Sequence, residues 1–209
     1  MLGLEALGSA LGLSAGRVAT AMAGSLREAV GGEPGVVVAV GADLGRALAR
    51  AGFEVIVIAT GPRPARRRKK DPPSVRAQLE ALPFESASVD GVFAAGDVLG
   101  AAEAGSGATG AGASVLASIR LLIELGRIVR PGGVVGIAAP ATGLVRKVAP
   151  PEDIASRFLH AALVGVEQRP VGSFVLTSAR VGAVRARLAT ANATRQAAPT
   201  ALAFLERSQ

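Results

Sequence analysis

Cysteine and histidine, two residue types that often carry out covalent or metal chemistry, are nearly absent from this 209-residue chain. The chain has no cysteine and a single histidine, His160. Disulfide frameworks, cysteine-type zinc sites and thiol nucleophiles are therefore excluded, and a serine–histidine pair would have to use His160. Because His160 falls in the last turn of an expected helix, where the helix dipole stabilises a cation, we assign it a structural role. The sequence predicts no catalytic residue and no metal site.

A glycine-rich segment is the best candidate for a ligand-binding loop. Gly41, Asp43 and Gly45 follow a short apolar run at residues 36–40, and glycines placed after a strand let the backbone approach a ligand closely. Their spacing differs from the G-x-G-x-x-G pattern of dinucleotide-binding proteins, and no acidic residue ends the next expected strand. A dehydrogenase is therefore not favoured.

Most of the positive charge is concentrated in one loop. Residues 61–73 carry six basic side chains and Asp71, a net charge of +5 out of the chain's +7, which leaves +2 for the other 196 residues. We predict that this loop contacts an acidic partner, a nucleic acid or an anionic surface, although a solvated, proline-rich loop is the simpler interpretation. With no aromatic residue in the loop, such binding would be electrostatic and salt-sensitive. The predicted anion-binding residues are Arg63, Arg66, Arg67, Arg68, Lys69 and Lys70.

These candidate residues are positioned by alternating apolar runs and helical segments. Apolar runs bounded by glycine or proline indicate buried parallel strands, and their alternation with helices predicts a doubly wound, Rossmann-like, mostly parallel α/β sheet. Two closing strands with no helix between them predict a C-terminal antiparallel hairpin. Helices are expected at residues 4–30, 44–51, 114–129 and 151–162, and strands at 36–40, 55–59, 89–95, 134–139, 163–168 and 173–179. Residues 74–81 are expected to form a short connection and residues 100–113 a flexible loop.

The chain divides into three parts by this interpretation: an N-terminal helical extension (1–30), an α/β domain (31–182) and a C-terminal helical tail (183–209). We expect the two terminal helices to be exposed and to dock a protein partner or a second copy. The uncharged run near the N-terminus is 11 residues long, far below the roughly 20 that a bilayer requires. Since no export signal is present, we expect a cytoplasmic protein without a membrane span.

Two further segments add a family resemblance. Residues 82–90 (LPFESASVD) and 124–133 (ELGRIVRPGG) resemble the LPF…SFD and E-x-x-R-V-L-K-P-G-G segments of the class I S-adenosylmethionine-dependent methyltransferases, particularly the type 11 group. Residues 37–45 lie where that family has its glycine-rich loop, and the resemblance covers roughly residues 30–180. It implies the class I methyltransferase fold, with Asp90 serving the fold. The cofactor positions that it implies are Gly41, Asp43, Gly45, Ala59, Gln78 and Asp97.

These cofactor positions depart from the family's pattern. The family's loop is acidic-x-G-x-G-x-G, but here Ala39 stands at the acidic position and Asp43 at the middle glycine. Ala59 stands where the family's acidic residue, at the end of the second strand, accepts hydrogen bonds from the ribose hydroxyls. Losing such contacts would weaken cofactor binding by about 2–5 kcal/mol, roughly 30- to several-thousand-fold.

The departures favour a methyltransferase-like pseudoenzyme, which binds no cofactor and serves as a binding or scaffolding subunit. The alternative is an active S-adenosylmethionine-dependent methyltransferase with an atypical pocket. In that case the alignment would slip by a few residues, so that Glu54 or Asp43 takes over an acidic role. A third interpretation, an electrostatic adaptor acting through the basic loop, is compatible with the first.

Overall fold

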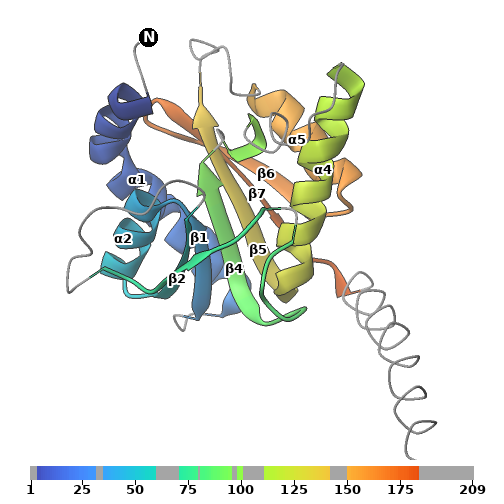
Figure 1. Cartoon of the computed structure of the whole chain (residues 1–209), viewed down its shortest axis with the longest axis horizontal. Coiled ribbons are helices and arrows are strands. Elements are labelled where there is room, and N and C mark those ends of the chain that lie inside the picture. The colour runs from blue at the N-terminus through green and yellow to red at the C-terminus, as the bar shows by residue number, and fades with distance from the viewer. Residues whose placement is uncertain are drawn as a thin grey trace, which may run out of the picture.

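The computed structural model describes residues 4–31, 35–59, 71–79, 81–95, 98–100, 111–141 and 150–183. Within these residues, seven strands form one sheet in the order β3-β2-β1-β4-β5-β7-β6, and helices cover both faces (Figure 1). The strands are β1 (Val36–Val40), β2 (Glu54–Ala59), β3 (Ser74–Arg76), β4 (Val89–Ala95), β5 (Val129–Pro140), β6 (Val164–Val171) and β7 (Phe174–Arg180). The named helices are α1 (Leu4–Val30), α2 (Ala42–Arg50), α4 (Ala111–Ile128) and α5 (Pro151–His160).

The sheet is parallel except at its C-terminal hairpin. β1 pairs in parallel with β2 and β4, β2 with β3, and β4 with β5. β7 lies between β5 and β6 and is antiparallel to both. This confirms the doubly wound sheet with an antiparallel hairpin that the sequence predicts. Because β1, β2, β3 and β4 are parallel, their carboxyl ends lie together at one edge of the sheet.

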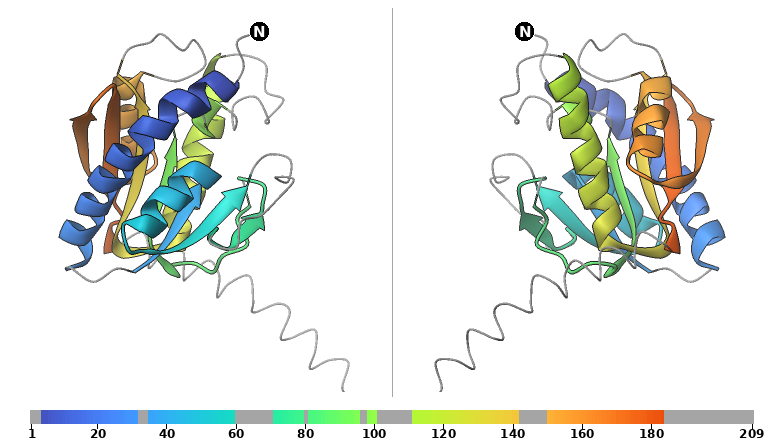
Figure 2. Two further views of the ribbon diagram at one scale, coloured as in Figure 1. Left: turned by 90° about the vertical axis from the view of Figure 1, so that its left-hand side faces the viewer. Right: turned by 90° about the vertical axis from the view of Figure 1, so that its right-hand side faces the viewer.

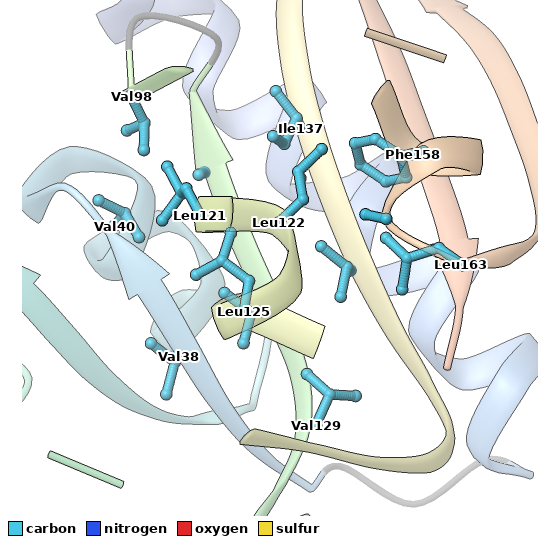
Figure 3. Packing of buried hydrophobic residues seen from close by; sticks show 14 of the residues in the cluster. Val38, Val40, Val98, Leu121, Leu122, Leu125, Val129, Ile137, Phe158 and Leu163 are labelled. Atoms are coloured by element: carbon cyan, nitrogen blue, oxygen red, sulfur yellow. The ribbon is translucent and has the colours of Figure 1, made fainter. Parts of the chain in front are cut away.

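Each face of the sheet has its own apolar core. α1 and α2 cover one face, and α4 and α5 cover the other (Figure 2). Successive residues of a strand point to opposite faces, so Val38 and Val40 of β1 pack on the α4 side while Val37 and Ala39 pack on the α1 side. On the α4 side, leucines of that helix fill the space above β1 and β5 (Figure 3). Because both faces of the sheet are covered, residues on either face of a strand are apolar, which explains the nearly continuous apolar runs in the sequence.

The second half of α1 belongs to the core. Val18, Met22 and Leu26 recur every four residues and are buried against the sheet. Arg27 lies 5.3 Å from the ring centroid of Phe53 and so ties the end of α1 to the start of β2. The expectation of an exposed first helix is therefore wrong for this half, because an amphipathic helix buries its apolar face wherever a sheet face is available. The division into extension, domain and tail stays a prediction, and the tail lies almost wholly outside the described residues.

Three element boundaries also differ from those expected. Residues 74–76 form the edge strand β3 instead of a connection, and Val57 N–H donates to Pro73 O over 2.8 Å just before it. β5 begins at Val129, directly after α4, and its register against β4 shifts between Val89 and Gly91. α4 begins at Ala111, inside the segment expected to be a loop. Strands of three residues and glycine-rich helix starts carry too little periodicity to be recognised from sequence.

No helix among the described residues is long and apolar enough to cross a membrane.

Candidate cofactor site and the segments that support it

The glycine loop joins β1 to α2 at the carboxyl edge of the sheet. Gly41 has φ +108, a backbone conformation that residues with a side chain rarely adopt, and its N–H donates to Ile58 O of β2 over 3.1 Å. A Cβ built on Gly41 would meet no atom of the described residues within 4 Å. No side chain in the described ranges caps the start of α2, whose N-cap residue is Gly41.

Gly45 has a different role, because it lets α2 lie close to β2. A Cβ on Gly45 would lie 2.3 Å from Cγ2 of Val57 and 3.6 Å from Cβ of Ala39. The first of these distances is far below van der Waals contact, so packing of the helix on the strand requires glycine here. Gly45 is thus explained by the fold alone.

Asp43 stands in the first turn of α2, and its side chain is 57% exposed. Its carboxylate forms an ion pair and hydrogen bond with Arg46, one turn further along the helix. Arg46 Nη1 also lies 3.7 Å from Asp71 Oδ1, just ahead of β3. The negative charge at the middle position of the loop is therefore balanced by an arginine of the same helix.

The two alanines remove the carboxylates expected at this edge. Ala39 is fully buried in the apolar cluster that also contains Leu48 and Val57, so its neighbours are hydrocarbon. Ala59 is half-buried at the end of β2 and pairs with Arg76 of β3. Neither methyl group can accept a hydrogen bond from a ribose hydroxyl.

Gln78 lies two residues beyond β3 and is exposed. The backbone carbonyl oxygen of Gln78 accepts a hydrogen bond from Ala81 N–H over 3.2 Å, within an isolated β-bridge between these two residues. The structure thus places Gly41, Asp43, Gly45, Ala59 and Gln78 on the elements that end at one edge of the sheet. Asp97 and the basic residues Arg63, Arg66, Arg67, Arg68, Lys69 and Lys70 lie outside the described residues, and their roles stay predictions.

A network that sequence reasoning missed joins the two family-like segments to each other. Arg127 of α4 donates from Nη1 to Phe84 O over 2.9 Å and from Nη2 to Leu82 O over 3.1 Å. The carboxylate of Glu124 accepts hydrogen bonds from Arg127 Nε and from Leu82 N–H, each over 2.8 Å. We call this set of contacts the Glu124–Arg127 clamp. The i, i+3 spacing of an acid and an arginine was visible in the sequence, but their partners Leu82 and Phe84, 42 to 45 residues away, were not.

The electrostatics of the clamp follow from these contacts. Burial by itself raises the pKa of Glu124, but the hydrogen bonds from Arg127 and from Leu82 N–H outweigh it, and the pKa is lowered from its ordinary value of 4.5. The hydrogen bond to Glu124 likewise raises the pKa of Arg127. Both groups are therefore stabilised in their charged forms.

Asp90 and His160 have structural contacts, as the sequence suggests. Asp90 Oδ2 accepts a hydrogen bond from Val36 N–H over 2.6 Å, and Oδ1 lies 2.6 Å from Nε of Arg130. These contacts hold the start of β1 against β4 and β5. His160 Nδ1 lies 2.8 Å from Ser156 O within its own helix.

A small hollow lies between α1, β6 and β7, away from the glycine loop. Ser25, Glu28, Glu167 and Arg180 are among its lining residues, and its volume accommodates only about one or two waters. Ser25 Oγ is buried there without a hydrogen-bond partner in the described chain. A hollow of this size is too small to hold a cofactor.

Comparison with known proteins rests on structure alone. No protein-family model matches the sequence, and a search of curated proteins finds no match either. A chain of the Haloferax volcanii complex between the Trm112 methyltransferase activator and a methyltransferase superposes with a TM-score of 0.55 at 16% identity, over 77% of this chain and 88% of that one. The Burkholderia thailandensis 1,6-didemethyltoxoflavin-N1-methyltransferase gives 0.54 at 19% identity, over 81% and 79%. The chain has the class I methyltransferase fold.

The similarity to these solved structures establishes the fold and not the activity. Solved chains that match this structure number 530, so the architecture is shared by many proteins. Because one fold hosts many functions, the activity has to be argued from the residues at the site.

Proposed function

We propose that this chain is a methyltransferase-fold protein that has lost catalysis and serves as a binding or scaffolding subunit. The observation that carries the proposal is the pair of alanines at the carboxyl edge: Ala39 is buried in hydrocarbon and Ala59 ends β2. Without a carboxylate at position 59, S-adenosylmethionine loses the acceptor of its ribose hydroxyls, and at position 39 the loop lacks its acidic residue. The loss corresponds to about 2–5 kcal/mol of binding free energy.

The charge arrangement of the loop supports the same proposal. Asp43 adds a side chain where the methyltransferase loop has glycine, and its carboxylate is already paired with Arg46. A bound cofactor would therefore have to tolerate or displace this pair. The Haloferax volcanii neighbour occurs in a complex with an activator protein, which supports a role for this fold in protein assemblies. The basic residues 63–70 are our candidates for contact with an acidic partner.

A second candidate function is an active methyltransferase with an atypical pocket. The conformation of the loop favours it, since Gly41 keeps its positive φ, and within the described part of the chain no atom crowds it and no side chain caps the start of α2. The two candidates differ in the affinity that they predict for S-adenosylmethionine.

Calorimetric titration of the full chain with S-adenosylmethionine and S-adenosylhomocysteine separates them. We expect no heat of binding up to millimolar ligand, because the ribose acceptors are missing. Binding at low micromolar ligand would overturn the proposal and establish the second candidate.

Restoring a carboxylate makes the test sharper. Ala59→Asp places an acceptor at the end of β2, where the residue is only half-buried, and should strengthen S-adenosylmethionine binding by about 10- to 100-fold. Ala87→Asp is the matched control, because Ala87 is exposed just before β4, at the opposite edge of the sheet, and has φ 58, which aspartate tolerates. Equal affinity of the two variants would show that Ala59 is not the missing contact.

A further inference from the structure

One helix carries most of the exposed large apolar side chains of the described chain. Five such residues are exposed: Val115, Leu116 and Ile123 of α4, Leu159 of α5 and Val164 of β6. Leu116 is 56% exposed and Ile123 46%. Scattered single apolar residues are normal on a surface, but Leu116 and Ile123 lie two turns apart on the same face of one helix.

The spacing places these residues along one line. Leu116, Ile119 and Ile123 follow each other at i, i+3 and i+7, which is one face of an α-helix. The opposite face of α4 buries Leu121, Leu122 and other leucines against the sheet (Figure 3). Leu116 and Ile123 are exposed, whereas Ile119 between them is partly buried and also packs against the core cluster on the α4 side of the sheet. We call Val115, Leu116, Ile119 and Ile123 the α4 stripe.

One uncompensated positive charge lies beside the α4 stripe. Arg120 is exposed between Leu116 and Ile123, and it forms no ion pair with any residue in the described ranges. Arg127, the next arginine of the helix, is already neutralised by Glu124 over 2.8 Å. Among the described residues, an occupant of the stripe therefore meets apolar side chains with the Arg120 cation beside them.

This charge decides between the occupants that the stripe could take. A second copy of the chain, packed antiparallel across a two-fold axis with Leu116 opposite Ile123, would bring the two Arg120 side chains together at the axis. The chain's own residues 184–209 contain four arginines and one glutamate, a net charge of +3, and would also be repelled. A helix with carboxylates beside its apolar residues complements the surface instead.

We propose that the α4 stripe is the docking surface for an amphipathic, acidic helix of another protein. The inference goes beyond the proposed function, because docking on the outer face of α4 does not depend on whether S-adenosylmethionine binds at the edge of the sheet. The arginine sets the orientation and charge preference of the partner helix, and the apolar residues provide most of the contact area.

Two synthetic helical peptides test this proposal on the full chain. Both are about 20 residues long and carry leucines at i, i+3 and i+7 spacing, and they differ only in having glutamates or lysines beside the leucines. Fluorescence anisotropy at physiological salt should show the glutamate peptide binding at least about fivefold more tightly. Arg120→Glu should reverse this preference, and the double change Leu116→Gln with Ile123→Gln should weaken binding of the glutamate peptide about tenfold or more.

Matched variants distinguish peptide binding at the α4 stripe from nonspecific hydrophobic binding and from misfolding. Leu159→Gln changes an equally exposed leucine of α5, and Arg50→Glu changes an exposed arginine of α2, so neither should alter peptide binding. Circular dichroism confirms that each variant is folded.

Three outcomes would overturn the proposal. The first is equal affinity for both peptides, or no binding of either up to about millimolar concentration. The second is a dimer in light scattering that Leu116→Gln dissociates, which assigns the stripe to a second copy. The third is peptide binding that appears only after truncation behind Ala183, which assigns the stripe to the chain's own tail.

Discussion

The two edges of the sheet differ in how closely they keep the methyltransferase pattern. At the amino edge, the Glu124–Arg127 clamp binds the backbone of residues 82–84 and Asp90 holds the start of β1. At the carboxyl edge, alanines occupy both acidic positions and Asp43 occupies that of a glycine. The segments that most resemble the family are therefore those that hold the fold together. Their retention is no argument for catalysis, and the departures are concentrated where a ligand would bind.

The clamp is where a single change should have the largest effect. Arg127→Ala removes the donor to the carbonyl oxygens of Leu82 and Phe84 and leaves the carboxylate of Glu124 with only the Leu82 N–H. Because these groups are partly buried, we expect the free energy of unfolding to fall by about 2–4 kcal/mol in urea denaturation. Arg120→Ala, on the exposed side of the same helix, serves as the control and should change it by less than about 0.5 kcal/mol. Similar losses in both variants would mean that the clamp does not support the fold.

At the carboxyl edge, we expect changes in packing, and not the loss of polar contacts, to lower the stability of the fold. Gly45→Ala forces a methyl group against Val57, and overpacking of this kind costs about 1–3 kcal/mol of stability. Combining it with Val57→Ala makes room, so the double variant should be less destabilised than the sum of the single changes. Simple additivity would show that α2 shifts away from β2 instead. Denaturant unfolding of the four proteins in the cycle measures this.

The smallest effect is the pH dependence of the clamp. Since the pKa of Glu124 is lowered in the folded protein, its charged form contributes stability above the ordinary value, and that stability is lost as the pH falls through the folded pKa. Glu124→Gln keeps an acceptor for Leu82 N–H but does not titrate. The stability difference between the native chain and this variant should therefore shrink from about pH 6 to pH 3 in urea denaturation. A difference independent of pH would contradict the assignment.

Some helices and strands of this molecule are predicted from the sequence and others are missed. β1, β2 and β4 are predicted because each is an apolar run bounded by glycine or polar residues, and the β6–β7 hairpin because no helix separates its strands. β3 is missed because Ser74, Val75 and Arg76 show no pattern longer than a single alternation. The burial of α1 against the sheet is missed because the apolar face of a helix can be recognised from sequence, but the surface that covers it cannot.

The sequence by itself determined the order of strands and helices, and through it the edge where a ligand would bind, since parallel strands bring their carboxyl ends together. It also determined that this edge lacks carboxylates at positions 39 and 59, because those are residue identities. Only the tertiary structure decided that Arg127 binds the backbone of Leu82 and Phe84, that Asp43 is paired with Arg46, and that Leu116 and Ile123 remain exposed. These facts depend on contacts between segments far apart in the chain or on the burial of one helix face. Local periodicity encodes neither of them.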